Sequence, residues 1–137
     1  MKSFLPAILL ILLGLSITLS CQKQEDLLLA DIVGVYSGTG ESNLLSAELT
    51  LVGDDVVNIR IFSSNPSVET IYLNDLMVNI AVTKSKEFGS SSFTSWLFSF
   101  SNFEVLSHGN VLANTDSKDL TMSLVWLNGF FNGYKKR

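Results

Sequence analysis

Residues 120–135 read LTMSLVWLNGFFNGYK, and this stretch predicts a β-hairpin close to the end of the chain. Apolar side chains occupy every second position from Leu120 to Trp126, which is the pattern of a strand with one buried face. Asn128-Gly129 follows, and because both residues tolerate positive φ, the pair favours a two-residue type I′ turn. Pairing outward from that turn sets Trp126 opposite Phe131, Leu124 opposite Gly133 and Met122 opposite Lys135, all on one face.

The same two-residue period recurs through the rest of the chain. Apolar and polar residues alternate over 47–51, 57–61, 76–82 and 96–100, whereas only residues 27–30 (LLLA) predict a helical turn. A spacing of about 8–12 residues for each strand and turn is typical of an antiparallel sandwich or barrel and not of βαβ units. We therefore expect an all-β fold of eight or nine antiparallel strands, arranged as a sandwich or a barrel. The predicted turns lie at 53–55, 63–66, 74–75, 89–91, 108–110 and 114–116.

The N-terminal region predicts export. Residues 4–20 read FLPAILLILLGLSITLS, and no charged residue lies between Lys2 and Lys23. A positive start, an apolar run and small residues before a cleavage site indicate a secretory signal peptide. The uncharged stretch also has about the 20 residues that a transmembrane helix needs, so a retained helix is the alternative.

The residues before Cys21 favour cleavage. Ile17-Thr18-Leu19-Ser20-Cys21 resembles the lipobox of bacterial lipoproteins. The resemblance implies a cut after Ser20 and acylation of the Cys21 thiol, with palmitate among the chains. Two or three acyl chains anchor a protein stably, because each buried CH₂ contributes roughly 0.8 kcal/mol. We thus expect a lipoprotein signal peptide at 1–20, a lipidated tether at 21–30 and a barrel domain at 31–137, with plain secretion or a retained helix as alternatives.

The tether indicates a location. Residues 23–26 (KQED) resemble the acidic export tag of surface lipoproteins in the Bacteroidetes. Gln22 also differs from the Asp that retains lipoproteins in the inner membrane of enterobacteria. These resemblances imply an outer-membrane lipoprotein of a bacterial cell envelope, displayed at the surface. A charged run that is only a solvated tether is the other interpretation.

Composition excludes several classes of protein. The chain has 137 residues, with 9 basic and 13 acidic side chains. Removing residues 1–20 leaves 137 − 20 = 117 residues, one domain by size, with a charge of 8 − 13 = −5. Because phosphate contact needs a basic face, that charge argues against nucleic-acid binding. Cys21 is the single cysteine, so no internal disulfide can form.

Two short motifs suggest how the barrel closes. Asp31-Ile32-Val33-Gly34-Val35-Tyr36 resembles the first strand of calycin-type barrels, the superfamily that includes lipocalins. Phe131-Asn132-Gly133-Tyr134-Lys135 resembles the last strand of small calycin-like lipoproteins of the Bacteroidetes. The resemblance implies an antiparallel up-and-down calycin-like barrel of about eight strands, in which Lys135 covers Tyr36 and Gly34 gives the chain room. The implied closure residues are Gly34, Tyr36, Phe131, Gly133 and Lys135.

The sequence predicts no catalytic residue, no metal and no cofactor. A nucleophile needs a neighbouring base, and the only histidine, His108, lies in a predicted exposed turn. Asp54-Asp55 is typical of a solvated hairpin tip and not of a calcium site. A pair of glycosidase carboxylates meets only in space, so the sequence leaves that enzyme class open.

Aromatic residues are the remaining candidates for a site. The chain has nine Phe, three Tyr and two Trp, and five of these lie within residues 93–103. They can fill the core, since an eight-stranded barrel is only just wide enough for its own side chains. Alternatively, they line a small apolar pocket at the barrel mouth. The pocket-lining candidates are Tyr36, Trp96, Phe98, Phe100 and Trp126.

Apolar side chains are also expected on the outside of the barrel. Leu97 is expected to point outward, and with Leu127 and Phe130 it would form an exposed patch that docks a partner. We therefore expect a non-enzymatic cell-envelope lipoprotein, anchored in the membrane through acylated Cys21. Its barrel would bind a small apolar ligand or an envelope component such as a protein. The alternative is a protein-binding inhibitor or assembly factor that acts through the barrel loops.

Overall fold

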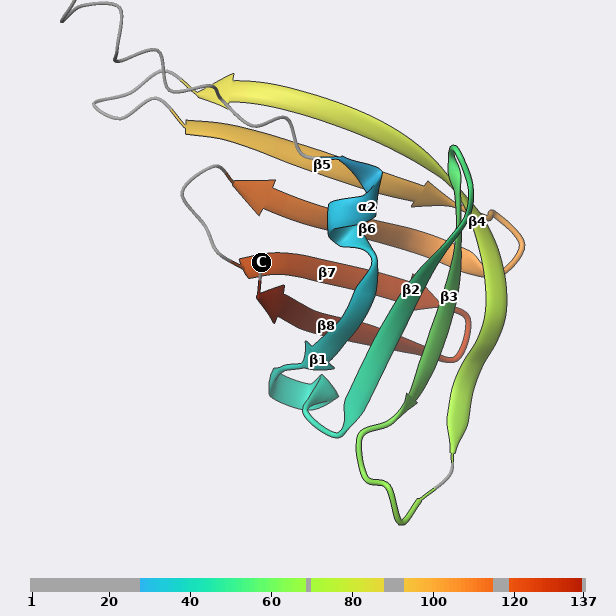
Figure 1. Ribbon diagram of the computed structural model, residues 1–137. Coiled ribbons are helices and arrows are strands. Elements are labelled where there is room, and N and C mark those ends of the chain that lie inside the picture. Colours follow the sequence, from blue (N-terminus) through green and yellow to red (C-terminus); the bar gives the residue numbers. More distant parts are fainter. Residues whose placement is uncertain (1–27, 69, 88–92, 115–118, 137) are drawn as a thin grey trace, which may run out of the picture.

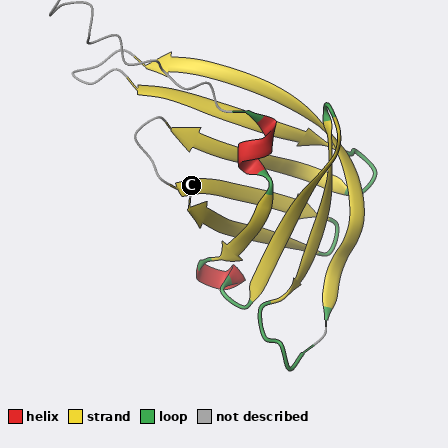
Figure 2. Cartoon of the chain, viewed as in Figure 1, coloured by secondary structure: helices red, strands yellow, loops and turns green. Residues whose placement is uncertain are grey.

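The protein is a closed barrel of eight antiparallel strands in which each strand pairs with the next along the chain (Figures 1 and 2). The computed structural model describes residues 28–68, 70–87, 93–114 and 119–136. The predicted all-β, up-and-down barrel is confirmed. The predicted signal peptide, Cys21 and most of the tether lie outside the described residues. No described helix has the length and hydropathy needed to span a bilayer.

The strands are long enough to wrap around one interior. In Figure 1, β2–β4 run across β5–β8, and the short helix α2 lies at one end between them. In chain order the elements are α2 (Leu29–Ile32), β1 (Gly34–Gly38), the 3-10 helix η2 (Gly40–Ser42), β2 (Leu45–Gly53), β3 (Val56–Ser63), β4 (Ile71–Glu87), β5 (Phe93–Ser101), β6 (Leu106–Asn114), β7 (Asp119–Trp126) and β8 (Gly129–Lys136).

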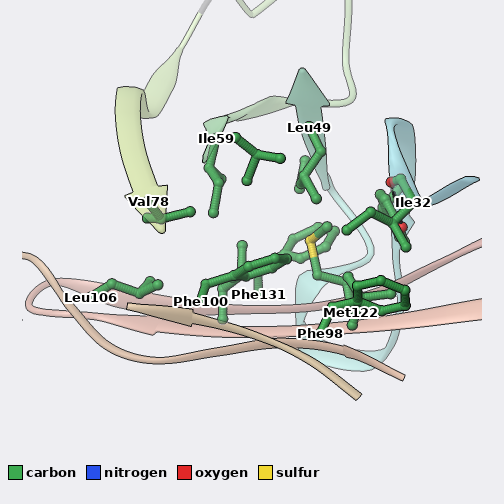
Figure 3. Close-up of a cluster of buried hydrophobic side chains, with 14 of the residues drawn as sticks. Ile32, Leu49, Ile59, Val78, Phe98, Phe100, Leu106, Met122 and Phe131 are labelled. Carbon is green, nitrogen blue, oxygen red and sulfur yellow. Dashed lines mark hydrogen bonds between the residues drawn. The ribbon is translucent and has the colours of Figure 1, made fainter. Parts of the chain in front are cut away.

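The barrel interior is apolar. About every second residue of each strand points inward, and most of these inward residues are hydrophobic. Leu49, Ile59 and Val78 point from β2–β4 toward the side chains of the opposite wall (Figure 3). Phe131 on β8 belongs to that opposite wall and is fully buried. Ile32 of α2 is also fully buried, so the helix closes one end of the core.

The first and last strands close the ring. Ser37 of β1 pairs with Tyr134 of β8, and Gly38 pairs with Gly133. A Cβ on Gly133 would lie 2.6 Å from the carbonyl oxygen of Ser37, so only glycine fits at that crossing.

The C-terminal hairpin forms, but the predicted turn is wrong by one residue. Trp126 pairs with Gly129, so Leu127 and Asn128 make the turn. In the described part of the chain, positive φ occurs at Gly34, Gly40 and Asp75, so the turn is not type I′. A Cβ on Gly129 would lie 2.7 Å from Cζ2 of Trp126, which indicates that this glycine makes room for the indole ring.

This earlier turn shifts the hairpin register by two positions. Phe131 therefore pairs with Leu124, not with Trp126 as predicted. Because side chains alternate between the two faces with a period of two, an even shift leaves the same residues on the inner face. The observed inner pairs are Trp126 with Gly129, Leu124 with Phe131, Met122 with Gly133 and Leu120 with Lys135.

Two other predicted turns lie inside strands. Asn74-Asp75 is a bulge in β4, where the pairing register shifts between Ile59 and Ile61 of β3 and φ of Asp75 is 49°. His108-Gly109-Asn110 lies within β6, and a Cβ on Gly109 would come within 2.6 Å of Cδ2 of Leu106. Asn, Asp and Gly mark bulges and close approaches as well as turns, and this is why both predictions were wrong.

Candidate functional site

The aromatic side chains that were candidates for a ligand pocket lie in the barrel core. Trp96, Phe98 and Phe100 face inward from β5, and Trp126 faces inward from β7. Their exposed fractions run from 1% for Phe98 to 8% for Trp126. Water therefore reaches almost none of their surface, either from outside or from an internal void. This burial indicates side chains packed against one another.

Tyr36 of β1 is likewise fully buried, at the end of the barrel that α2 closes. Its hydroxyl donates a 2.7 Å hydrogen bond to the carbonyl oxygen of Ile32. Burial raises the pKa of this hydroxyl far above its ordinary value. Tyr36 therefore fixes α2 to the first strand as a neutral hydrogen-bond donor.

Lys135 makes the other connection between α2 and the barrel. Its ammonium donates hydrogen bonds to the carbonyl oxygens of Asp31, at 2.9 Å, and of Val33. Desolvation lowers the pKa of Lys135, and the nearby charge of Asp31 opposes that shift. Gly34 has a φ of +126°, which side-chain-bearing residues rarely adopt, and a Cβ there would lie 3.3 Å from Nζ of Lys135. These contacts hold the end of α2 to the last strand.

A pocket of about 410 Å³ lies at this same end, lined by Ala30, Asp31, Lys135 and Lys136. The Lys135 ammonium already donates to two carbonyl oxygens there, so its role in the structure is to hold the chain.

The outer wall formed by β5–β8 has very little charge. Residues 120–134 contain no Asp, Glu, Lys or Arg, and residues 93–114 contain only Glu104 of these types. Small polar side chains and exposed apolar ones fill the positions that point outward. The wall, defined here as these outward residues, includes Leu97, Ser99, Asn110, Leu112, Thr121, Ser123, Val125, Phe130, Asn132 and Tyr134.

The strand register divides the apolar side chains of this wall into two rows. Leu97 pairs with Leu112, in a row that continues through Thr121 to Tyr134. Phe130 pairs with Val125 in a separate row, next to the exposed turn residue Leu127. The polar side chains of Asn110, Ser123 and Asn132 lie between the two rows. The single patch predicted from Leu97, Leu127 and Phe130 is therefore wrong, and the wall has two apolar rows on either side of a polar one.

A second outer feature lies between β3 and the loop that leads to β4. Arg60 and Phe62 point outward from β3 and form part of a pocket of about 460 Å³. The guanidinium carbon of Arg60 lies 5.4 Å from the centre of the Phe62 ring, within cation–π range. The other lining residues are Ser63, Ser64, Asn65, Pro66, Val68, Thr70 and Ile71. Sequence reasoning missed this pocket, because a single arginine in a strand predicts only an outward side chain in solvent.

The residues considered for catalysis or calcium binding lie on the outside of the barrel. Nε2 of His108 lies 2.8 Å from Nδ2 of Asn110, on the outer side of β6. Asp54 and Asp55 form the exposed tip between β2 and β3, as predicted. Within the described residues, no three His, Cys, Asp or Glu side chains are placed to hold a metal ion.

Comparisons with protein families, with curated proteins and with solved structures found no match to this chain.

Proposed function

We propose that this protein is a lipid-anchored, non-enzymatic lipoprotein of the bacterial outer membrane that binds another envelope protein through its β5–β8 wall. The proposal includes cleavage after Ser20 and acylation of Cys21. It also includes membership of the calycin-like barrels, because the eight-stranded closed barrel is compatible with that fold. Gly34 and Lys135, which carry the resemblance, lie close together, because a Cβ on Gly34 would lie 3.3 Å from Nζ of Lys135.

The single observation that carries the proposal is the composition of the wall. Protein interfaces are depleted in charged residues at their centre and enriched in aromatic ones. Leu112 is 43% exposed and Phe130 is 41% exposed, on a wall where residues 120–134 have no charged side chain. The charged residues of the barrel lie mainly on β2–β4, including Glu48, Arg60 and Asp75.

The buried aromatic side chains support binding on the wall over binding inside the barrel. An apolar ligand in the interior would need surface that the protein leaves uncovered, and a pocket for a small molecule typically occupies about 300–1,000 Å³. Phe98 and Trp96 leave almost no surface uncovered, because their exposed fractions are 1% and 3%. The proposal therefore places the partner outside.

The proposed anchor would keep the barrel close to the membrane. Six residues lie between Cys21 and Leu28, the first described residue, so seven steps separate them, and a fully extended chain covers at most about 3.6 Å per step. The acylated cysteine would thus lie within about 25 Å of the end of the barrel that α2 closes.

Mass spectrometry and fractionation of Cys21→Ala test the anchor. The variant should keep residues 1–20 and carry no acyl chain, because the thiol that receives the lipid is gone. Wild-type protein should begin at Cys21 with the mass of its acyl chains. Normal processing and membrane anchoring of Cys21→Ala would refute the lipoprotein assignment.

Site-directed crosslinking tests the wall. Since acylation would consume the thiol of Cys21, an introduced cysteine would be the only free thiol in the mature protein. Phe130→Cys and Leu112→Cys should each give a thiol-dependent adduct of the same defined mass in cells that make this protein. Thr50→Cys, exposed on the outer side of β2, is the matched control and should give none. Equal adducts from all three positions, or none from the wall, would refute the proposed interface.

A further inference from the structure

The pocket between β3 and the β3–β4 loop contains a cation that the described protein leaves without an anionic partner. Arg60 points outward from β3, and its Nε atom is buried without a hydrogen-bond acceptor among the described residues. A buried donor without an acceptor carries a desolvation cost that no hydrogen bond offsets. An acceptor supplied by a ligand would remove that cost.

Two acidic side chains lie near Arg60 in the strand register, and neither forms an ion pair with it. Glu48 is directly opposite on β2. Asp75 is in the β4 bulge on the other side, but its Oδ1 accepts a 3.0 Å hydrogen bond from Nδ2 of Asn58. Arg60 instead lies over the ring of Phe62. Both nearby acids therefore leave Nε of Arg60 without an acceptor.

Irregular pairing of β4 with β3 shapes the region around the pocket. The register shifts between Ile59 and Ile61 and again between Ile61 and Phe62, so β4 has extra residues opposite Arg60 and Phe62. Such bulges re-aim side chains and are common beside functional sites. The loop that follows is ordered by its own hydrogen bonds, from the backbone N–H of Asn65 to Ser63 Oγ and from that of Ser67 to Asn65 Oδ1.

The pocket lining combines this cation with an apolar surface. Phe62, Pro66, Val68 and Ile71 supply the apolar part, and Thr70 is a further lining residue. Val68 and Ile71 are 46% and 43% exposed, so the apolar surface is open to an incoming molecule. A volume of about 460 Å³ is in the range of pockets for small molecules.

We propose that this pocket binds a small organic carboxylate that carries one apolar group. Arginine matches a carboxylate through two parallel N–H···O bonds, which a point charge cannot reproduce. The guanidinium would move from the Phe62 ring into the pocket, where Nε and one Nη donate to the two carboxylate oxygens. The apolar group of the ligand would then cover Val68 and Ile71. This site is separate from the β5–β8 wall and does not depend on the proposed anchor.

Three small molecules test separately the carboxylate contact and the apolar contact of the proposed site. Hexanoate has both the carboxylate and the apolar chain, hexan-1-ol has only the chain, and acetate has little beyond the carboxylate. Each is titrated into the full-length chain in one non-ionic detergent, with the backbone amide NMR shifts of Ser63, Ser64 and Ile71 as the readout. Hexanoate should bind at least tenfold more tightly than either of the other two, because each of them lacks one of the two contacts.

Substitutions at Arg60 test the role of the guanidinium. Arg60→Gln should weaken hexanoate binding at least tenfold, and Arg60→Lys should restore only part of it. Lys136→Gln removes the same charge from the exposed end of β8 and should leave binding unchanged. All variants are compared in the same detergent, so partitioning of the probe into micelles affects them equally.

Glu69 belongs to the β3–β4 loop by sequence but lies outside the described residues. Glu69→Gln removes a negative charge from this loop and should leave hexanoate binding unchanged or strengthen it. Several results would overturn the proposal: no shift with hexanoate, equal binding of hexanoate and hexan-1-ol, equal binding of hexanoate and acetate, an Arg60→Gln variant that binds like wild type, or weaker binding in Glu69→Gln.

Discussion

Replacing Phe98 with alanine distinguishes a packed barrel interior from a ligand pocket. Phe98 is 1% exposed on the inner face of β5 and lies among the core side chains drawn in Figure 3. Its strand neighbours are Val82 on β4 and Val111 on β6. Truncation would remove a whole ring from a closed interior and leave a cavity that the surrounding strands cannot fill.

The expected loss follows from that burial. Phe→Ala in a packed core costs about 3–5 kcal/mol, against a total stability of about 5–15 kcal/mol for a domain. Urea denaturation of the full-length chain, followed by tryptophan fluorescence, measures the loss. With a urea dependence near 2 kcal/mol/M, the midpoint should fall by about 2 M. Leu112→Ala is the matched control on the outer side of β6, and its cost should stay below about 1 kcal/mol because Leu112 is 43% exposed.

An apolar fluorescent dye provides the opposite test on the same proteins. If the interior is packed, wild-type protein should show no saturable dye binding that depends on Phe98. The reasoning would be refuted by a stability loss no larger than that of Leu112→Ala. Saturable dye binding by the wild type that Phe98→Ala or Trp96→Ala weakens without unfolding would also refute it, and would move the ligand into the barrel.

Further predictions concern Tyr36, Lys135 and Gly109. Burial raises the pKa of Tyr36 in the folded state, so above about pH 10 the unfolded chain holds fewer protons than the folded one. The free energy of unfolding should therefore fall there by up to about 1.4 kcal/mol per pH unit for this group. In urea titrations from pH 9 to 11, Tyr36→Phe should make that fall shallower, and an unchanged slope would contradict the assignment. Lys135→Met removes two hydrogen bonds to the carbonyl oxygens of Asp31 and Val33 and should cost about 1–3 kcal/mol, whereas Lys136→Met, at an exposed position, should cost under about 0.5 kcal/mol in the same denaturation assay. Gly109→Ala should cost about 1–3 kcal/mol, because its Cβ would lie 2.6 Å from Leu106 Cδ2 and 3.1 Å from Leu124 Cδ2. Gly53→Ala, whose Cβ would meet nothing closer than 3.9 Å, should be nearly neutral by thermal unfolding, and similar losses at the two glycines would show that the clash at Gly109 is relieved.

Strand positions could be predicted from the sequence because burial of one face forces a period of two. The runs at 47–51, 57–61, 76–82, 96–100 and 120–126 all lie within strands. Turn positions were less predictable, since Asn, Asp and Gly also occur where a strand bulges or approaches a neighbour closely. Asp75 shows this plainly, because its positive φ belongs to a β4 bulge and its carboxylate accepts a hydrogen bond from Asn58.

The Arg60 pocket could not be predicted from local sequence. It depends on the paired register of β3 and β4 and on a loop that begins after Ser63. Alternation correctly gives Arg60 an outward direction, but no sequence rule says that Glu48 and Asp75 leave its guanidinium without an ion pair. Contacts between residues this far apart become visible only in three dimensions.

Closure of the barrel limits how a partner can bind. A strand at an open sheet edge can pair with a strand of another protein, and charged side chains, lysine above all, commonly protect such edges. Here β1 pairs with β8, and β3 pairs with β4 up to Asn79. Beyond that point β4 continues beside β5 alone among the described strands, and the sequence places Lys84 in that extension. Lys84 therefore disfavours strand addition at this extension, and we expect a partner to bind through side chains instead. The outer wall of β5–β8, where residues 120–134 carry no charged side chain, is the part of the described surface that we expect to suit that role best.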